Sequence, residues 1–582
     1  MRSVPVMMLV AVAMSLAGGA CAAADEAQAT REVQALTARV KGFHPVSLPR
    51  AGTLTLQPEQ ALTIDMLRGV ALDDNPPVLG ERPAPFDPRM TDDYPPGEAP
   101  YVAKGIAPFR FRTFHNEFNY GGWHNWAMCE YASTHGFDIL SSYNHKPADW
   151  PHVPAGTKWL LWGGFVDWHK WLPAHGLADV RFDQLMDVDV AAKLAEEQVF
   201  KPAPGFDYLM IDLEHGFLRP EKLREQDWYP QAAPAAERAA FEKKYYDGYA
   251  RTYTAPVEAA RKAGYSNISL YGWQPFGRTY FGLDKVKLDP LTDFAWNAYG
   301  RQIYNAVDLL NPSVYCFYWT PQNVAYTLAN IDLNMALVRT MTPAKPVRPY
   351  FWTLLHGGGG GWRWWANQPL PTEEARAMMA LAFFTGIDGL DQWNWSGTGN
   401  HQLPPPLKEG ADVMVGQPFR CPAEGEGGAE REFARYDVLH IVGAADGTVR
   451  FQWLNKSDAK GSTAATAPIY AMKQEELTPQ LRTSAEPVAA VVEGLALVQP
   501  LEYILRHGEV KLDVSAQEQF GQTLPIVRRV KLGQWHVLAT YDPGCVHGGP
   551  PRAIELKDFD GRAGLTVSLP ADAQTRVFVL GE

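Results

Sequence analysis

The stretch FDYLMIDLEHG, residues 206–216, decides the fold of this chain. Leu209–Ile211 is a short apolar run, typical of a parallel strand that is buried on both faces. The run ends in two acids, Asp212 and Glu214. This pattern predicts a buried parallel strand with two carboxylates at its carboxyl end.

Asp212 and Glu214 are two residues apart, and residues at this spacing point the same way in a strand. Two carboxylates held together cannot both ionise cheaply. The pKa of one therefore rises, and that group becomes a general acid near neutral pH. Glycoside hydrolysis needs such a proton donor. The alternative is a structural acid pair that caps a helix or binds an arginine.

Composition sets the class of protein. The chain has 582 residues, of which 46% are hydrophobic, and this length predicts more than one domain. The net charge is −12, and no basic run or nucleic-acid motif is present, so we expect no nucleic-acid partner. An acidic surface also disfavours a general attraction for polyanionic substrates.

The N-terminus resembles an export signal. Arg2, an apolar run at Val6–Leu16 and small residues at 20–24 predict a signal peptide over residues 1–24. The run is too short for a stable membrane anchor, and no later stretch predicts a transmembrane span. We expect a periplasmic or secreted protein. An outer-membrane lipoprotein, anchored through Cys21, is the weaker alternative because the usual leucine three places earlier is missing.

Alternating strand and helix patterns fill residues 104–402, and they predict a (β/α)8 TIM barrel. A doubly wound sheet is the alternative, but no Gly-rich phosphate loop follows the first strand. The main expected helices span Ala236–Ala263, Thr292–Leu310, Asn323–Thr340 and Thr372–Thr385. The expected strands are Phe109–Phe114, Phe137–Ser141, Thr157–Trp162, Tyr208–Leu213, Ile268–Tyr271, Ser313–Phe317, Val347–Thr353 and Gly389–Trp393.

The segments on either side of the barrel have other patterns. Residues 25–103 predict an extended leader or strap with one short helix near Ala27–Val40, and the Pro/Gly-rich residues 403–432 predict a linker. Short alternating runs over residues 433–582 predict a C-terminal antiparallel β-sandwich. These runs are Tyr436–Val442, Thr448–Leu454, Pro487–Val492, Ala496–Leu505, His536–Tyr541, Leu565–Leu569 and Arg576–Leu580.

Polar and aromatic residues cluster at the predicted carboxyl ends of the strands, where barrels of this type place their active sites. Sugar rings stack on flat aromatic faces, and of 19 tryptophans only Trp453 and Trp535 lie after Trp395. The spacing of the histidines and cysteines predicts no metal site, and no motif predicts a cofactor. The candidate substrate-binding residues at the strand ends are His115, Glu117, Trp273, Tyr318, Trp319, Asp391, Trp393 and Asn394.

Three motifs together resemble known glycosidases. Asp207, Met210, Asp212 and Glu214 are similar to the DxxDxDxE signature of chitinase-type enzymes, with Met210 in place of the middle aspartate. The remaining D-x-E resembles hyaluronidase-type glycosidases. NPSVY at residues 311–315 and GIDGLDQW at 386–393 are similar to the strand-six tyrosine and the Trp-ending last strand of that family.

The resemblance implies a retaining mechanism in which the N-acetyl oxygen of the substrate attacks the anomeric carbon. Glu214 would then protonate the leaving oxygen. Asp212 would orient and polarise the acetamido group and raise the pKa of Glu214. Tyr315 would hydrogen-bond the same group, and Trp393 would form the floor beneath the sugar. The expected partner is therefore a poly- or oligosaccharide.

Two alternatives stay open at this point. The chain can be a two-carboxylate retaining glycosidase on neutral glycans, with Asp212, Glu117 or Asp391 as nucleophile or base. It can also be a catalytically silent carbohydrate-binding protein. The missing acid at Met210 favours silence, whereas the Asp212–Glu214 pair favours catalysis.

Overall fold

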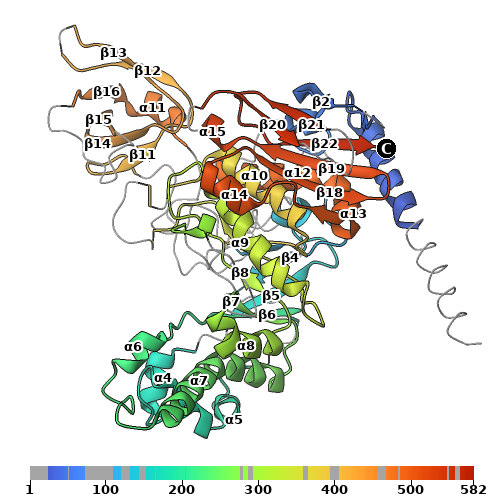
Figure 1. Cartoon of the computed structure of the whole chain (residues 1–582). Helices are drawn as coiled ribbons and strands as arrows, with labels where there is room; N and C mark the ends of the chain where they lie inside the picture. Colours follow the sequence, from blue (N-terminus) through green and yellow to red (C-terminus); the bar gives the residue numbers. More distant parts are fainter. Residues whose placement is uncertain are drawn as a thin grey trace, which may run out of the picture.

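Figure 1 shows the chain as a computed structural model. The predicted signal peptide falls outside the described part except for its last residue, and so does Asn394. The structure describes residues 24–49, 52–72, 109–119, 131–142, 153–163, 166–202, 205–275, 280–285, 293–357, 365–366, 368–393, 406–425, 427–454, 467–482, 485–546, 549–556 and 564–582.

Eight parallel strands form a barrel, as predicted. Their order is β8-β7-β6-β5-β4-β3-β10-β9. Parallel bridges from Leu310 to Val347 and from Ser313 to Tyr350 join the two ends of this order, so the sheet closes. The strands are β3 (Glu117–Asn119), β4 (Ile139–Ser142), β5 (Lys158–Gly163), β6 (Tyr208–Ile211), β7 (Ile268–Gly272), β8 (Asn311–Pro312), β9 (Tyr350–Trp352) and β10 (Asp391–Trp393).

Helices follow the strands and cover the barrel. The predicted long helix is confirmed as α7 (Ala235–Lys262), which packs beside β7. Figure 1 shows the helices that follow β5 to β7 grouped at one end of the molecule. The helices are α4 (Trp168–Ala174), α5 (Val190–Glu196), α6 (Pro220–Arg224), α7, α8 (Arg301–Ala306), α9 (Asn323–Val338) and α10 (Thr372–Ala382).

The first barrel strand begins later than predicted. The expected strand Phe109–Phe114 is an irregular segment with a single bridge at Phe109, and β3 begins at Glu117. Phe109, Phe111 and Phe114 are buried nonetheless, and Phe111 stacks on Phe383. The strand boundary was misplaced because these phenylalanines are buried without pairing in a sheet. Aromatic residues are as common in a buried core as in a strand, so their pattern does not separate the two.

The helix that closes the barrel comes from far along the chain. Pro487–Val492 and Ala496–Leu505 were predicted as strands, but these segments belong to α12 (Ala485–Val498), to the turn after it and to the start of α13 (Glu502–His507). α12 packs closely on α10, so that a Cβ at Gly494 would lie 2.7 Å from the Arg376 carbonyl oxygen. The next residue of α12, Leu495, lies against Gly136, as does Phe109. α12 thus lies between the last and first strands, in the place of an eighth helix.

A small β lobe is inserted between β10 and α12. It contains the sheet β11-β14-β15-β16 and the hairpin β12-β13, and it has its own hydrophobic core around Phe433, Phe451 and Tyr470. β11, β12 and part of β13 lie within residues 403–432, the segment predicted to be a linker. The strands are β11 (Asp412–Met414), β12 (Phe419–Pro422), β13 (Glu430–Phe433), β14 (Val438–Ala445), β15 (Thr448–Leu454) and β16 (Tyr470–Lys473).

The predicted C-terminal antiparallel β-sandwich is present, and it includes strands from the N-terminal segment. A five-stranded sheet, β1-β22-β19-β18-β17, faces the three-stranded sheet β2-β21-β20 across a shared core. The strands are β1 (Val46–Ser47), β2 (Leu54–Leu56), β17 (Glu509–Lys511), β18 (Ile526–Leu532), β19 (Trp535–Tyr541), β20 (Arg552–Leu556), β21 (Leu565–Leu569) and β22 (Arg576–Gly581).

The larger sheet of the sandwich is buried on both faces. Successive side chains of a strand point to opposite faces. Along β22, Phe578 and Leu580 belong to the sandwich core, whereas Val577 and Val579 join the core shared with the barrel helices. β18 and β19 contact α13, and β19 also contacts α10. The sandwich therefore lies directly on the barrel (Figure 1).

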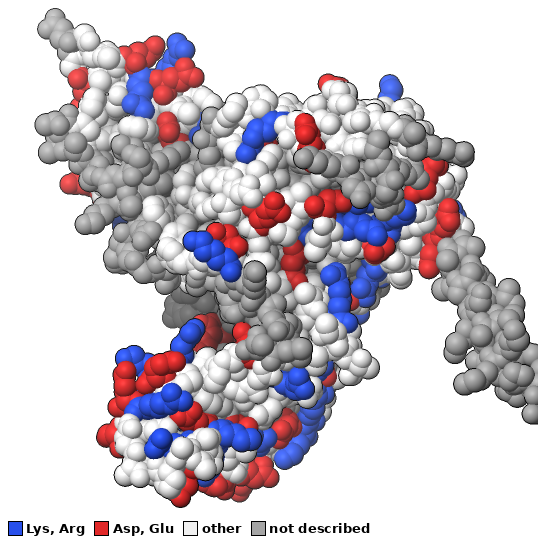
Figure 2. All heavy atoms as spheres, viewed as in Figure 1, with Lys and Arg blue, Asp and Glu red and all other residues white. Residues whose placement is uncertain are grey.

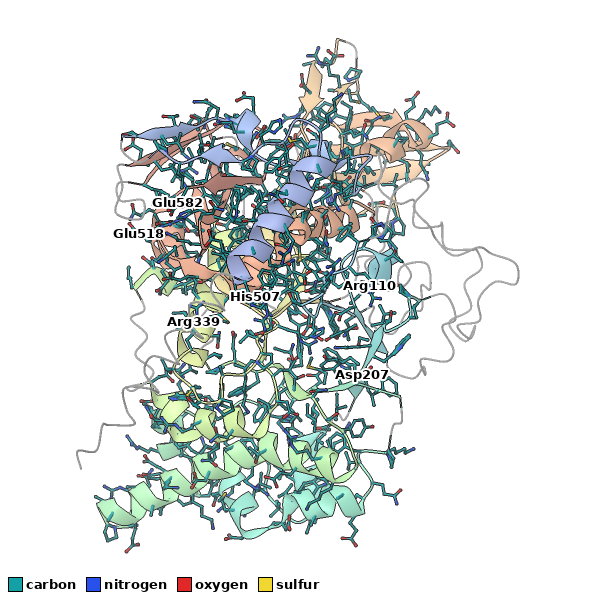
Figure 3. The ribbon with its side chains drawn as sticks, turned by 90° about the vertical axis from the view of Figure 1, so that its right-hand side faces the viewer. Arg110, Asp207, Arg339, His507, Glu518 and Glu582 are labelled. Carbon is teal, nitrogen blue, oxygen red and sulfur yellow. The ribbon has the colours of Figure 1, made fainter. Side chains whose placement is uncertain are left out.

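The N-terminal helix, residues 24–39, docks on α13 rather than acting as a loose leader (Figure 3). Both carboxylate oxygens of Glu32 accept from the backbone N–H of Tyr503, at 3.0 and 3.1 Å, and the Trp535 indole donates to Thr30 at 3.0 Å. Burial raises the pKa of Glu32 to about 7, and the charge of Glu502 adds to the rise.

Charged side chains of both signs are intermingled on the face shown in Figure 2, most densely over α4–α8. Among the described residues on that face, no extended basic area is visible. No helix in the described part has both the length and the apolar content needed to cross a membrane.

Replacing Phe43, just beyond the N-terminal helix, tests whether this segment is part of the folded core. Phe43 is 1% exposed and joins the main hydrophobic core. We expect Phe43→Ala to reduce the free energy of unfolding by about 3–5 kcal/mol. Denaturant unfolding with Lys41→Ala as exposed control checks this. Equal stability of both variants would mean that the segment does not dock.

Candidate active site

A pocket of about 500 Å³ opens at the carboxyl ends of four neighbouring barrel strands. β6, β7, β8 and β9 are each followed by residues that line it, and α7 with residues 295–300 forms its outer wall. The lining residues are Leu213, Glu214, His215, Gly216, Tyr249, Tyr253, Tyr271, Gly272, Trp273, Gln274, Pro275, Ala295, Tyr299, Gly300, Ser313, Tyr315, Phe317 and His356.

Of the predicted acid pair, Glu214 lines this pocket, and Asp212 lies two residues before it without lining the pocket. Ile211 is the last residue of β6, and Glu214 is exposed and lines the pocket, whereas the intervening Leu213 is buried. Asp212 is half-buried, and its Oδ1 is buried with no hydrogen-bond partner among the described residues. Burial raises the pKa of Asp212 to about 6, and the neighbouring charge of Glu214 contributes to the rise. The two carboxylates therefore interact electrostatically. The raised pKa belongs to Asp212, whereas the resemblance implied that Asp212 raises the pKa of Glu214.

Buried tyrosines lie beside the acids. Tyr315 is 4% exposed and lines the pocket, and its hydroxyl has no hydrogen bond of ordinary geometry in the described part. Burial raises the pKa values of Tyr315 and Tyr271, and the negative charges of Glu214 and Asp212 raise them further. Both tyrosines thus stay neutral and can donate a hydrogen bond to a ligand near the two acids.

Aromatic rings pack against one another at the end of β10, and Trp393 contacts the pocket residue Tyr271 without lining the pocket itself. The ring of Trp393, at the end of β10, lies 4.6 Å from Trp162 and 6.0 Å from Tyr271. Trp273 lines the pocket directly. A sugar ring would find flat apolar faces and polar N–H and O–H groups together here.

Two histidines border the pocket and stay neutral near pH 7. Burial lowers the pKa of His356, whose ring lies 5.8 Å from that of Tyr315. Burial also lowers the pKa of His215, and the adjacent His169 contributes, since their rings are 4.9 Å apart. His169 Nδ1 in turn lies 2.7 Å from an Asp179 carboxylate oxygen.

Glu117 and Asp391 were predicted at the substrate, but they are fully buried inside the barrel. They face each other at the starts of β3 and β10, with the Tyr350 hydroxyl donating to Glu117 at 2.9 Å and the Asn311 amide donating to Asp391. Arg348 Nε lies 4.0 Å from Asp391. Burial raises the pKa values of both acids. This network belongs to the barrel interior and does not line the pocket.

His115 was also predicted at the substrate, but it lies at the opposite end of the barrel. It precedes β3, and its Nδ1 is 2.7 Å from Asp138, just before β4. Lys158, the first residue of β5, approaches the same ring at 3.4 Å. These positions mark the amino ends of the strands. The prediction was wrong because β3 begins eight residues later than the expected strand. His115 therefore precedes the first barrel strand instead of following it.

Tyr318 and Trp319 follow the strand-six segment but do not line the pocket. The Tyr318 ring lies 4.9 Å from Tyr280 and 6.1 Å from Phe281, which is 80% exposed. Trp319 contacts Tyr436 of the inserted lobe, with ring centres 6.1 Å apart. Neither side chain forms part of the pocket wall.

Asp207, the first residue of the DxxDxDxE-like motif, also has a structural position. Its carboxylate accepts from the Trp159 N–H at 2.8 Å, and its carbonyl accepts from Asn267. It precedes β6 and is seen at the barrel side in Figure 3. Met210, in place of the middle aspartate, is fully buried, and its sulfur lies 3.3 Å from the Ser269 hydroxyl.

The described residues contain no group of three or more histidines, cysteines, aspartates or glutamates arranged to hold a metal ion. Cys316, Cys421 and Cys545 are free thiols. Cys316 is fully buried, and burial raises its pKa to about 12.

The sequence analysis missed the tyrosines of α7 that reach the pocket, Tyr249 and Tyr253. Their spacing with Tyr245 is i, i+4 and i+8, which places all three on one helix face. Such a row of hydroxyls on an apolar face was the signal that would have found them.

The fold and the pocket define a (β/α)8-barrel protein with an aromatic pocket at the strand ends, where Glu214 lines the pocket and Asp212 interacts with it. No protein-family model matches the sequence, and no curated protein is found similar to it.

Solved structures similar to this chain include TIM-barrel glycosidases. Bee venom hyaluronidase, in complex with a hyaluronic acid tetramer, is 21% identical with a TM-score of 0.27, over 35% of this chain and 65% of that one. A GH18 chitinase from Pseudoalteromonas aurantia is 14% identical with a TM-score of 0.26, over 49% and 96% of the two chains. An endo-β-1,4-mannanase from Cellulomonas fimi is 14% identical with a TM-score of 0.28, over 62% and 88%. At these values the strand topology, rather than the similarity, carries the fold assignment.

Proposed function

We propose that the protein is a glycoside hydrolase that acts on a poly- or oligosaccharide containing N-acetylhexosamine. The observation that carries this proposal is Glu214 in an aromatic pocket with Asp212 beside it, the pKa of Asp212 being raised to about 6 by burial and by Glu214. A structural acid pair would bind an arginine or cap a helix, yet Asp212 Oδ1 has no hydrogen-bond partner among the described residues.

In this mechanism Glu214 donates its proton to the glycosidic oxygen as the bond to the anomeric carbon breaks. The acetamido oxygen of the substrate forms the new bond to that carbon, which gives a cyclic, positively charged intermediate. Water then opens the ring, and the Glu214 carboxylate takes up the proton of the water. The products are a hemiacetal of retained configuration and the released alcohol group.

Three other side chains have supporting roles in the proposal. Asp212, beside Glu214, orients the acetamido group and stabilises the positive charge that develops on it. Tyr315 donates a hydrogen bond to the same group from its buried position in the pocket. Trp393, packed on Trp162 and Tyr271, provides the apolar floor beneath the sugar ring.

The position of the other acids supports substrate assistance over a two-carboxylate mechanism. Glu117 and Asp391 are fully buried in the barrel interior and are hydrogen-bonded there, so neither can reach an anomeric carbon in the pocket. Asp212 then remains as the acid beside Glu214, and it is half-buried. An acetamido oxygen supplied by the substrate removes the need for a carboxylate nucleophile.

Hydrolysis of a glycan panel by purified residues 25–582 tests the proposal. We expect release of reducing ends from chitin oligomers or hyaluronan and none from glycans without an acetamido group. Cleavage of a neutral glycan without that group would keep the glycosidase and discard substrate assistance. If calorimetry shows glycan binding and no glycan is cleaved, the protein is a carbohydrate-binding protein and not an enzyme.

A further inference from the structure

The segment that carries the acid pair has no regular secondary structure. β6 ends at Ile211, and residues 212–219 lie outside any helix or strand until α6 begins at Pro220. A general acid must nevertheless be held close to its productive position, because a misplacement of about 1 Å costs on the order of 100-fold in rate. Some other part of the molecule has to fix this segment.

Two tyrosine hydroxyls of α7 converge on one carbonyl next to Glu214. The His215 carbonyl oxygen accepts from Tyr249 at 2.9 Å and from Tyr253 at 3.0 Å. The two hydroxyl oxygens are themselves 3.2 Å apart, so the three oxygens form a closed triangle. Both tyrosine side chains are buried, at 5% exposure. The peptide unit between His215 and Gly216, one residue beyond Glu214, is thus anchored to the helix.

Two further tyrosines hold the same segment three residues later. The backbone N–H of Leu218 donates to the Tyr245 hydroxyl at 3.0 Å, and the Tyr246 hydroxyl donates to the Leu218 carbonyl at 3.0 Å. Both polar groups of the Leu218 main chain are therefore satisfied by tyrosines. Together, Tyr245, Tyr246, Tyr249 and Tyr253 form what we call the tyrosine ladder.

The ladder stands on a rigid support. α7 has 28 residues, and the four tyrosines lie within nine consecutive residues of it on adjoining faces. Gly248, in the middle of the ladder, lies so close to the Phe182 carbonyl that a Cβ there would be 1.5 Å from its oxygen. The ring of Phe182 contacts Tyr245 and Tyr249. Helix, neighbouring segment and ladder therefore pack as one unit.

We infer that the tyrosine ladder positions Glu214, by fixing the main chain of residues 215–218 against α7. This inference rests on the proposed function, in which Glu214 is the proton donor. The ladder tyrosines are positioning residues in this role, because their hydroxyls bind the protein backbone and do not transfer the proton. Their removal should loosen residues 212–219, lower kcat and leave the folded barrel in place.

The test is the double variant Tyr249→Phe/Tyr253→Phe, with the single Tyr253→Phe in case the double variant folds poorly. Phenylalanine keeps the ring and removes only the hydroxyl. We expect faster hydrogen exchange in the peptide covering residues 212–219, a kcat lower by about 10–100-fold, and a KM within about threefold of the original. The two limbs of the pH–rate profile should also shift, because the distance between Asp212 and Glu214, and with it their electrostatic interaction, is no longer fixed.

Tyr265→Phe is the matched control. Its hydroxyl also donates to a backbone carbonyl, that of Lys201, at 2.6 Å, but it does not contact the pocket. We expect this variant to keep both kcat and the exchange rate of residues 212–219. If kcat falls equally in the control and in the ladder variant, the tyrosine ladder contributes only to general stability and does not position Glu214.

The two readouts separate this inference from the proposed function. Unchanged exchange of residues 212–219, or faster exchange with unchanged kcat, would overturn the positioning role. Absence of hydrolysis by the unsubstituted protein would overturn the proposed function and, with it, the catalytic consequence of the ladder. The exchange measurement would then still decide whether the ladder holds this segment.

Discussion

Replacing Glu214 with glutamine should lower kcat by roughly 10²–10⁴-fold and leave the fold intact. Glutamine has nearly the same shape, but it cannot donate a carboxylic proton to a leaving oxygen. Glu214 is exposed in the pocket, and its carboxylate makes no hydrogen bond or ion pair with another residue in the described part of the chain. Initial rates on N-acetylated oligosaccharides, together with a thermal unfolding curve, measure both parts of this prediction.

The leaving group provides a sharper version of the same test. An aryl glycoside with a strongly acidic phenol departs without protonation, so Glu214→Gln should lose much less activity on it than on a natural glycan. Glu237→Gln is the control, because Glu237 is an exposed acid on α7 away from the pocket. If Glu214→Gln keeps more than about a tenth of the activity on natural glycans, Glu214 is not the proton donor.

The parts of the fold that the sequence predicted well have a single dominant local signal. The apolar run at Leu209–Ile211 is buried on both faces in the barrel, and the helix expected at 236–263 is α7 within one residue at each end. The acids after β6 lie at the pocket because their place follows from the end of one well-marked strand. For these elements, local pattern and tertiary position agree.

The errors arose where burial came from a partner distant in the sequence. α12 is apolar on nearly every side because it is enclosed between α10, the Phe109–Gly136 region and α2 (Ile64–Leu67). An enclosed helix of this kind has the same apolar run as a buried strand. In the same way, β1 and β2 are too short to be recognised, and they exist because β22 and β21 pair with them.

The candidate site was predicted only in part for a related reason. Glu214, Asp212 and Trp273 follow strands whose ends were placed well, and Glu214 and Trp273 line the pocket. Tyr315 lines it too, although its predicted strand, Ser313–Phe317, begins where β8 has already ended. His115, Glu117 and Asp391 depended on the starts of β3 and β10, which lie eight and two residues later than predicted. In a barrel this error moves a side chain from the pocket to the interior or to the opposite end.

The second large effect is expected at Asp212. Asp212→Asn should lower kcat by roughly 10²–10³-fold, because a neutral amide cannot stabilise the positive charge on the acetamido group. Its effect on stability should have the opposite sign. The folded protein raises the pKa of Asp212 from 3.8 to about 6, so ionisation of this carboxyl costs more in the folded state than in the unfolded state.

The pH dependence follows from these two pKa values. Below about pH 4 the carboxyl is protonated in both states, and the Asn variant should match the original stability. As the pH rises from 4 to 6, the unfolded state releases the Asp212 proton while the folded state still holds it. The original protein therefore loses stability over this range. The shift corresponds to about 3 kcal/mol at most, and solvent screening of this half-buried group reduces the expected gain of the variant to about 1–2 kcal/mol at pH 8.

Measuring unfolding of both proteins at pH 4 and pH 8, beside their rates, decides between the two interpretations of the acid pair. A structural pair that holds a partner in place would lose stability when Asp212 becomes neutral, most of all at pH 8. A site that keeps two acids together for chemistry gains stability and loses rate from the same substitution. A less stable Asp212→Asn variant at pH 8 would therefore contradict the functional interpretation even if its activity were also lost.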